Sequence, residues 1–415
     1  MKVGIFLRPY SPEDGGRYTF SDEIINSLLR LSSHCSHQFV VFGTTKEPPP
    51  EIVLPRDTEY VSIVPARQRR LKYRLTALTA AILKRLRYPW SGFSVDRGQQ
   101  TFVLESLASN NIDMLWEPGP NCLSMDLPYV ITVWDLEHRV LPYFPEIDRE
   151  CRWDLQEQHY ATKLRRASFV ITETEAGKAQ VAKFYQVPKE RIKVLPFPLP
   201  GFVSRTTPST KDQIVAKYNL SERYLFYPAQ FWPLKNHANL LLAVQSLKEM
   251  HDLILPVVLC GSDKGNQAYI NQMAENLNVA DQVRCLGFVP REDLCSLYRN
   301  AFALVYVTFN GPSNLPPLEA FALRCPVIAS RIVGAEEQLG DAALLVDPKQ
   351  PEEIASAIRQ LWDDNSLRQS LIERGLARVS KRTSDDYVRG IFSILDEFVP
   401  IRRCWGSYLE GYKLK

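Results

Sequence analysis

The chain has 415 residues, with 50 lysines and arginines against 47 aspartates and glutamates and a formal net charge of +3. This length is too great for one ordinary hydrophobic core, so we expect two domains of comparable size. The near balance of charge argues against a general nucleic-acid binder and restricts any basic partner site to a local patch.

The N-terminus and the apolar runs predict neither secretion nor membrane insertion. The first residues, MKVGIFLRPY, reach a proline and then acidic residues too early for a signal peptide, and no run approaches the roughly 20 apolar residues of a spanning helix. The eight cysteines form no C-x-x-C pair, and several, such as Cys260, fall in apolar runs that suit a buried thiol better than a disulfide or a metal ligand. Likewise, the stretch from His34 to His37 is more typical of a polar surface turn than of a zinc site. We therefore expect a protein of the reducing cytoplasm without a metal site.

The first half begins as a doubly wound α/β domain. A short apolar strand, Val3–Leu7, is followed by a loop and by a predicted helix over residues 18–31. Gly15 and Gly16 lie in that loop, where a backbone without side chains can approach a phosphate closely. Because the G-x-G-x-x-G fingerprint is absent, a plain turn explains the pair equally well.

Residues 66–90 form the most unusual stretch of the first half. They contain eight basic residues and no acidic residue, and their leucines and isoleucine recur at helical spacing. A basic amphipathic helix can lie in the interface of an anionic membrane, although a helix packed on its own domain with a solvated basic rim has the same composition. The basic residues are Arg67, Arg69, Arg70, Lys72, Arg74, Lys84, Arg85 and Arg87.

Two further strands of this half end in polar loops. Glu117 closes the strand Asp113–Trp116, while Trp134, Asp135 and His138 follow the strand Tyr129–Val133. Loops at the carboxyl ends of parallel strands gather at one edge of a sheet, so these side chains are candidates for contacting a small polar ligand. For His138, a structural hydrogen bond is an equally good interpretation.

A proline-rich segment from Pro196 to Gly201 separates the two halves, and a second series of alternating strand and helix signals begins at Tyr224. The predicted fold class is therefore α/β, with two doubly wound Rossmann-like domains facing across a cleft. We assign residues 1–203 to the first domain, 204–222 to a linker, 223–385 to the second domain and 386–415 to a tail that crosses back to the first.

The second domain carries groups suited to a nucleotide-diphosphate site at its strand ends. Lys235 and Gln230 share one loop, in which the lysine can meet a phosphate and the glutamine can donate a hydrogen bond. A second loop, residues 308–317, precedes a predicted helix whose first turn contains Glu319, a carboxylate that can accept from a ribose diol. Loops after two other strands, with Gly261, Phe288 and Val289, can hold a base. Each feature alone also fits a solvated loop.

The motifs in series resemble those of the retaining nucleotide-sugar glycosyltransferases of family four, which have the GT-B fold. YPAQFWPLKNHANLLLAV, LGFVPREDL, GPSNLPPLEAFALRCPVIAS and GDAALLVDP lie in the second half, and DGGRYTF, VITVWDLEHR and RIKVLPFPLP in the first. The resemblance covers nearly the whole chain except about residues 45–100 and the tail. It implies a metal-independent hexosyl transfer from a UDP- or GDP-linked sugar to a glycan or lipid-linked glycan acceptor, with retention and without a cofactor.

The resemblance also implies roles for particular residues. Lys235 corresponds to the lysine that stabilises the leaving diphosphate, and Glu319 to the second glutamate of the E-x7-E motif, which binds the donor ribose. Residues 313–315 occupy the loop whose backbone meets the sugar and phosphate, and the glycine pair corresponds to the loop that closes over the donor. The donor-binding set is Gly15, Gly16, Gln230, Gly261, Phe288, Val289, Ser313, Asn314, Leu315 and Glu319; the catalytic set is Lys235, Glu319 and His138; the acceptor side is Trp134, Asp135 and Glu117.

Three departures from the family pattern lie in this set. Gly311 replaces the first glutamate of E-x7-E, Gln230 replaces the arginine that accompanies the lysine, and Trp134 replaces a histidine that precedes Asp135 in many members. These departures motivate an alternative, in which the protein is catalytically silent and binds nucleotide or glycan in support of a partner enzyme. An epimerase or phosphorylase of the same fold fits the motif series less well. We expect a cytoplasmic protein that meets the inner face of the membrane through residues 66–90.

Overall fold

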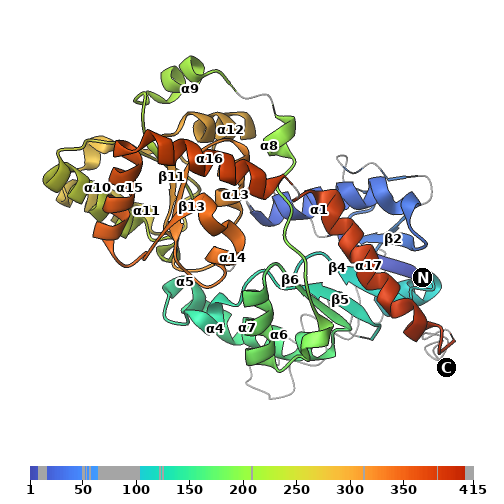
Figure 1. Ribbon diagram of the computed structural model, residues 1–415. Coiled ribbons are helices and arrows are strands. Elements are labelled where there is room, and N and C mark those ends of the chain that lie inside the picture. Colours follow the sequence, from blue (N-terminus) through green and yellow to red (C-terminus); the bar gives the residue numbers. More distant parts are fainter. Residues whose placement is uncertain are drawn as a thin grey trace. The chain divides into compact units, whose positions relative to one another are not determined.

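The computed structural model describes residues 1–7, 16–48, 52, 54–55, 58–63, 103–120, 123, 126–206, 209–311, 314–380 and 382–406. The basic stretch 66–90, Gly15 and Ser313 lie outside these residues. The chain divides into two compact units: unit 1 comprises Met1–Val133, Thr162–Ile171 and Val388–Lys415, and unit 2 comprises Trp134–Ala161 and Thr172–Tyr387. Figure 1 shows the elements of both.

A seven-stranded sheet with the order β3-β2-β1-β4-β5-β6-β7 contains the first series of strands. Adjacent strands from β3 to β6 pair in parallel, and their apolar runs are buried, as the doubly wound prediction requires. Two strands were not predicted from the sequence: β2, and the half-buried edge strand β3, whose sequence EYVS has little apolar signal. The strands are β1 (Lys2–Leu7), β2 (Gln38–Gly43), β3 (Glu59–Ser62), β4 (Met114–Glu117), β5 (Tyr129–Thr132), β6 (Phe169–Thr172) and β7 (Ile192–Val194).

The C-terminal helix α17 (Ser384–Arg402) ends in unit 1. Phe392 stacks on Phe39 of β2 with ring centroids 5.7 Å apart, and the Arg402 guanidinium lies 2.7 Å from the Asp113 carboxylate just before β4. Other helical segments of this unit are α1 (Gly16–Leu31), η2 (Ser32–His34) and residues 103–109. The tail therefore contributes apolar and charged contacts to the unit that contains the N-terminus.

Unit 2 contains a six-stranded parallel sheet with the order β10-β9-β8-β11-β12-β13. Successive strands run outward from β8 to β10 on one side, and from β11 to β13 on the other. The order therefore reverses between β8 and β11, and such a switch point is where open parallel sheets bind ligands, at the carboxyl ends of the strands. The strands are β8 (Leu225–Pro228), β9 (Val257–Cys260), β10 (Val283–Cys285), β11 (Ala303–Tyr306), β12 (Val327–Ser330) and β13 (Ala343–Val346).

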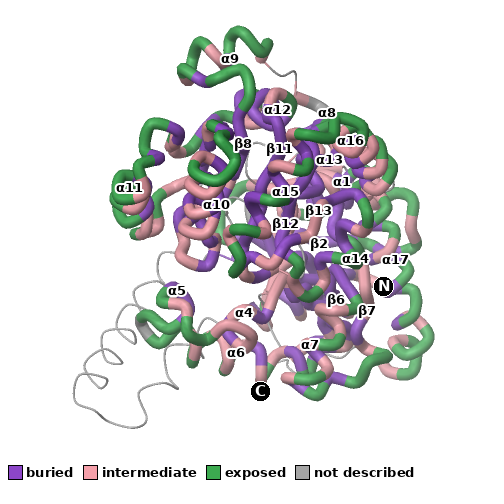
Figure 2. Tube along the Cα trace, turned by 60° about the vertical axis from the view of Figure 1, so that its left-hand side comes forward, coloured by how far each residue is buried: buried purple, intermediate pink, exposed green. Residues whose placement is uncertain are grey.

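Helix α15 buries an apolar stripe against this sheet. Its residues Ile354, Ile358 and Leu361 recur at helical spacing and are buried, while Pro351 occupies the first turn. Figure 2 shows strands such as β8, β11 and β12 as buried and much of α9 and α11 as exposed. The elements are α4 (Glu137–Val140), α5 (Pro145–Asp148), η3 (Arg149–Cys151), α6 (Arg152–Arg166), α7 (Glu175–Tyr185), η4 (Lys189–Arg191), α8 (Phe202–Arg205), α9 (Lys211–Tyr218), η5 (Pro233–Lys235), α10 (His237–His251), α11 (Gln267–Asn276), η6 (Ala280–Gln282), α12 (Arg291–Asn300), α13 (Leu315–Ala322), α14 (Ala335–Leu339), η7 (Gly340–Ala342), α15 (Pro351–Asp363) and α16 (Asn365–Val379).

The segment expected as a linker, residues 204–222, contains a helix. Thr210 and Gln213 form a capping box at the start of α9, which explains why a helix forms in a polar stretch. Lys217 and Tyr218 then each lie 2.5 Å from the Asp293 carboxylate on α12, so α9 is attached to the second sheet's own helices.

No helix among the described residues combines the length and apolar character needed to cross a bilayer. In the same part of the chain, no group of three or more His, Cys, Asp or Glu side chains is arranged to hold a metal ion.

One glycine sets how closely α16 approaches α13. A Cβ added at Gly375 would lie 2.6 Å from the Phe321 ring, so only a residue without a side chain fits there. We predict that Gly375→Ala lowers the free energy of unfolding by about 1 to 2 kcal/mol, because overpacking outweighs the roughly 1 kcal/mol gain in helix propensity. Urea unfolding followed by circular dichroism measures the change.

Gly177→Ala in α7 is the matched control, because its added Cβ would lie 3.3 Å from its nearest neighbours, a tight contact that a small shift relieves. The same gain in helix propensity applies there, so that variant should be at least as stable as the parent chain. A Gly375→Ala variant as stable as the Gly177→Ala variant would contradict the packing argument.

Candidate functional site

The backbone of Leu234 joins the loops that follow β8 and β11. Its carbonyl oxygen accepts hydrogen bonds from the Phe309 N–H at 3.0 Å and the Thr308 hydroxyl at 3.2 Å, and its N–H donates to Glu146 Oε1 at 2.7 Å. Each of these bonds is buried or partly buried, where losing a partner is costly. The next residue, Lys235, is therefore fixed at the switch point of the second sheet.

Asn236 strengthens the same connection. It adopts a left-handed backbone conformation, with φ of 59°, which asparagine tolerates better than most residues. Its buried side-chain amide donates to the carbonyl oxygens of Val307 and Pro348, both at 2.8 Å. Three strand-end loops, after β8, β11 and β13, thus converge on the turn that carries Lys235.

Lys235 presents a protonated ammonium at this edge. The ammonium lies 5.9 Å from the centroid of the Tyr306 ring. Burial lowers the pKa of Lys235, but Tyr306, Glu137 and Asp135 together outweigh that effect and raise the pKa above its usual value. The site therefore offers a fixed positive charge, which suits a diphosphate.

The position of the missing glutamate, Gly311, is closed to side chains. Its φ is +127°, and an added Cβ would lie 2.5 Å from the side-chain amide of Asn314. That amide donates to the Gly311 carbonyl oxygen at 3.0 Å. The structure thus replaces the carboxylate of the family pattern with the asparagine side chain, folded back over the loop.

Helix α13 begins earlier than the sequence analysis predicted. It starts at Leu315 with Asn314 as its N-cap, because Pro316 and Pro317 fit the first turn of a helix, where the N–H that proline lacks would have no intrahelical partner. The prediction that these prolines form an irregular loop and that Glu319 lies in the first turn was wrong. Among the first three helical residues only Leu315 has an N–H, so fewer donors face an anion than expected.

Glu319 lies in the second turn of α13 and is buried, with 8% of its surface exposed. The Tyr298 hydroxyl donates to its Oε2 at 2.7 Å. Burial raises the pKa of Glu319 to about 7, although Tyr298 and Arg291 oppose the shift. Near neutral pH the carboxyl group is thus present in both its protonated form and its ionised form, and the ionised form can accept from ribose hydroxyls.

His138 is fully buried in α4, away from an exposed ligand surface. Its Nε2 lies 2.9 Å from the Tyr185 hydroxyl and 3.4 Å from Glu157 Oε2, and its ring stacks on Tyr160. Burial lowers the pKa of His138 despite the opposing effect of Glu157, so the ring is neutral. These surroundings match the structural alternative for His138; proton transfer to a bound substrate would require the ring to become exposed.

The other predicted donor-side residues lie at or near strand ends of unit 2. Gln230 Oε1 accepts from the Trp232 indole N–H at 2.9 Å, so part of its amide is engaged within its own loop. Gly261 has φ of +147° and approaches the Ala229 backbone too closely for any side chain. Phe288 is exposed, with 65% of its surface accessible, whereas Val289 is buried.

The predicted acceptor-side residues divide between the units. Trp134 and Asp135 are half-buried in unit 2. Glu117, at the end of β4 in unit 1, is buried and accepts from the Leu123 N–H at 2.5 Å. Gly16 is the exposed first residue of α1.

Sequence reasoning missed four residues that support the site. Tyr306 ends an apolar strand, Tyr298 lies on an amphipathic helix, and Glu146 and Gln338 lie on short helices. Tyr306 interacts with Lys235, and the Tyr298 hydroxyl donates to Glu319. Glu146 accepts from the Leu234 N–H, and Gln338 accepts from the Asn314 N–H. Nothing in a single sequence distinguishes such side chains from surface polar residues.

Comparison with known proteins supports a glycosyltransferase assignment for the second sheet. The family described as glycosyl transferases group 1 matches residues 210–378. O-antigen chain mannosyltransferase B of Escherichia coli is 29% identical over 238 residues, which cover 57% of this chain and 62% of that protein. D-inositol 3-phosphate glycosyltransferase of Corynebacterium urealyticum is 30% identical over 220 residues, which cover 50% and 51% respectively. The matched part thus spans between half and two thirds of these relatives.

Solved structures match over almost the whole chain and confirm the GT-B fold. A glycosyltransferase from Rickettsia africae has a TM-score of 0.66 at 15% identity, covering 96% of this chain and 98% of that one. The lipopolysaccharide-biosynthesis glycosyltransferase WaaG has a TM-score of 0.64 at 17% identity, covering 94% and 99%. Anabaena Alr3699/HepE in complex with UDP and glucose has a TM-score of 0.68 at 16% identity, covering 96% and 100%.

The buried carboxyl group of Glu319 makes stability depend on pH. Its pKa is about 7 in the folded chain against 4.5 for the unfolded reference, so between these values the folded state binds more protons and the free energy of unfolding falls as pH rises. We predict that Glu319→Gln removes this loss. The stability of the variant relative to wild type should rise by about 1 to 3 kcal/mol between pH 5 and pH 8.

Urea titrations at pH 5, 6, 7 and 8 measure this difference. Glu222→Gln serves as the control, because Glu222 is exposed in a turn of the same unit. A stability difference between Glu319→Gln and wild type that stays constant over this range would contradict the raised pKa.

Proposed function

Because residues 210–378 form a glycosyl transferases group 1 domain, we propose that the chain transfers a hexosyl group from a nucleoside-diphosphate sugar to a glycan or lipid-linked glycan acceptor. The observation that supports this most directly is the position of Lys235. Its backbone is held at the switch point of a parallel sheet by the hydrogen bonds of the neighbouring Leu234, in the same unit as the helix that carries Glu319. A cation and a buried carboxylate are the groups needed for a diphosphate and a ribose.

In the proposed reaction, the bond between the anomeric carbon and the diphosphate oxygen breaks while the acceptor oxygen bonds to that carbon. Lys235 stabilises the negative charge that develops on the leaving diphosphate, and the Leu315 N–H can donate to the same anion. Glu319, in its ionised form, accepts from the donor ribose. The acceptor hydroxyl attacks from the leaving-group face with retention, and a phosphate oxygen takes its proton.

Names of similar proteins bear on the donor. One relative is named a mannosyltransferase, and one structural neighbour was solved with UDP-glucose. We propose a UDP- or GDP-linked hexose as donor, and a glycan or lipid-linked glycan as acceptor.

A catalytically silent binding protein is the second candidate. The backbone at Gly311 favours it, since a φ of +127° and the nearby Asn314 amide both oppose the side chain of the expected glutamate. This candidate predicts nucleotide binding without sugar transfer, so turnover separates it from the transferase.

Removing the fixed charge should affect catalysis more than folding. We predict that Lys235→Ala lowers kcat/KM for the donor about 100- to 1000-fold, the size typical of losing one group that stabilises a developing anion. Turnover is measured with a panel of UDP- and GDP-sugars and mixed glycan and lipid-linked acceptors, by release of nucleoside diphosphate.

Lys248→Ala is the matched control, because the Lys248 ammonium lies on the surface of α10, where it donates to the Asn278 carbonyl oxygen at 2.6 Å. It should turn over like wild type. If wild type binds a nucleoside diphosphate but transfers no sugar with any donor, the silent candidate replaces the transferase. If it binds no nucleotide, the transferase fails, and the silent candidate holds only if the protein binds a glycan.

We further propose that residues 66–90 hold the protein at the inner, anionic face of the membrane, in the cytoplasm. The proposal rests on their composition, with eight basic and no acidic residues among apolar positions at helical spacing. Each basic residue near an anionic surface contributes about 1 kcal/mol. A lipid-linked acceptor would then be available at the same surface.

Changing the eight basic residues of this stretch to glutamine should abolish sedimentation with vesicles that contain anionic lipid. The matched variant, with the six arginines changed to lysine, keeps the charge and should sediment like wild type. Neither variant should sediment with vesicles that contain zwitterionic lipid alone. Unchanged sedimentation of the glutamine variant would assign the stretch to packing within the protein.

A further inference from the structure

Gln338 makes two hydrogen bonds to the backbone of one donor-loop residue. Its side chain is buried, with 2% of the surface exposed, on the short helix α14. The Asn314 N–H donates to its Oε1 and its Nε2 donates to the Asn314 carbonyl oxygen, both at 3.1 Å. The glutamine amide therefore pairs with Asn314 as a neighbouring strand would, and it consumes the Asn314 N–H that a donor was expected to meet.

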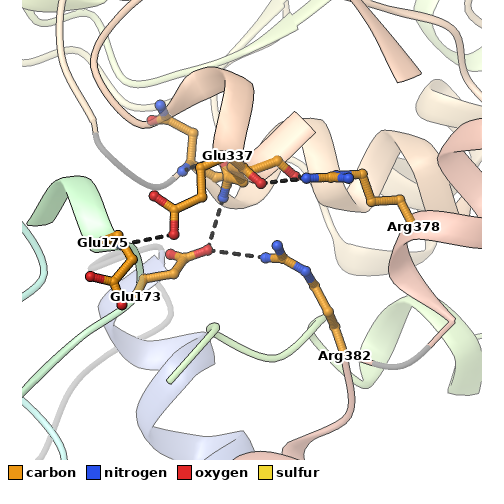
Figure 3. A network of polar contacts seen from close by, with 7 residues as sticks. Glu173, Glu175, Glu337, Arg378 and Arg382 are labelled. Atoms are coloured by element: carbon orange, nitrogen blue, oxygen red, sulfur yellow. Dashed lines mark hydrogen bonds and ion pairs between the residues drawn. The ribbon is translucent and has the colours of Figure 1, made fainter. Parts of the chain in front are cut away.

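A buried ion pair fixes which way this amide points. Gln338 Nε2 also donates to Glu173 Oε1 at 3.0 Å, and that oxygen lies 3.2 Å from Nη1 of Arg382. A carbonyl and a carboxylate both require the NH2 group, while the Asn314 N–H requires the oxygen, so the partners allow only one orientation of the amide. Figure 3 shows Glu173 and Arg382 in this network.

The helix that carries Gln338 is itself held in place. Arg378 on α16 donates to the carbonyl oxygens of Glu337 and Gln338, the latter at 2.7 Å. The Glu337 carboxylate accepts from the N–H groups of Glu175 and Ala176 at the start of α7, at 2.7 and 3.2 Å. Figure 3 shows Arg378, Glu337 and Glu175 in this arrangement. These contacts fix the position of α14, and with it the position of the Gln338 side chain that bonds to Asn314.

The consequence for ligand binding follows from the planarity of the peptide group. The Asn314 carbonyl and the Leu315 N–H belong to one trans peptide, so they point in opposite directions. Anchoring the carbonyl oxygen on Gln338 thus aims the Leu315 N–H away from α14. Because Pro316 and Pro317 have no N–H, the Leu315 amide is the donor that the first three residues of α13 can offer to an anion.

We infer that Gln338 is a positioning residue for the donor, which orients the Leu315 N–H toward the diphosphate without touching it. This inference rests on the proposed function. It also accounts for binding at a loop in which Gly311 supplies no carboxylate, since the remaining contacts depend more on backbone orientation.

Two variants and one control test the inference. Gln338→Glu keeps the size and the acceptor for the Asn314 N–H, but it loses both donated bonds and places a carboxylate beside Glu173. Gln338→Leu removes all three bonds, and carries the test if the glutamate variant does not fold. Gln282→Leu is the control: Gln282 is equally buried in the same unit, its side chain has no hydrogen-bond partner among the described residues, and it precedes β10 at the opposite end of the strands.

The probes are UDP and GDP, titrated calorimetrically into each protein well below its melting temperature, followed by steady-state kinetics with the donor that wild type uses. We expect the Kd of the nucleoside diphosphate and the KM of the donor to rise at least tenfold in both Gln338 variants. The acceptor KM should stay within twofold, a split that a general loss of structure would not produce. Gln282→Leu should leave all three constants unchanged.

Gln338 variants that bind the nucleoside diphosphate as wild type does would overturn the positioning role and leave the proposed function intact. Equal increases in donor and acceptor KM would also overturn it, because they indicate a structural defect. A wild-type protein that binds neither UDP nor GDP would instead contradict the proposed function, and this inference with it.

Discussion

The hydrogen bonds of the Leu234 backbone are the constraint on which the rest of the site depends. They join the loop after β8 to the loop after β11, the two strands between which the order of the sheet reverses, and they add the Glu146 carboxylate as a third partner. Lys235 follows directly, so these bonds fix the main-chain position from which its side chain extends. Preorganisation of this kind lets a charge act on a ligand without first being ordered.

Acidic side chains influence this site before any ligand binds. Asp135, Glu137 and Tyr306 raise the pKa of Lys235, while burial leaves Glu319 titrating near pH 7. A diphosphate that binds here would therefore replace the acidic side chains as the partner of the Lys235 ammonium. Ionised Glu319 is better suited than its protonated form to accept from ribose hydroxyls, so in the proposed function donor binding would be coupled to the loss of a proton.

Much of the fold could be predicted from the sequence because buried parallel strands are continuous apolar runs that end in polar loops. That pattern located Lys235 and Glu319 and both doubly wound sheets. It failed where local signals conflict with context: the edge strand β3 is too weakly apolar, Pro316 and Pro317 were interpreted as loop residues, and the burial of His138 depends on distant partners. Gln338 could not be found at all, since its role exists only through contacts with Asn314 and Glu173.

Hydrogen–deuterium exchange with and without a bound nucleoside diphosphate tests the central claim most directly, because it locates the ligand without assuming which sugar it carries. The account predicts slower exchange in peptides that cover residues 229–237 and 314–323, and unchanged exchange in η6, which precedes β10 at the opposite end of the strands. Binding that protects other segments, and leaves these two loops unaffected, would contradict the placement of the donor site at the switch point between β8 and β11.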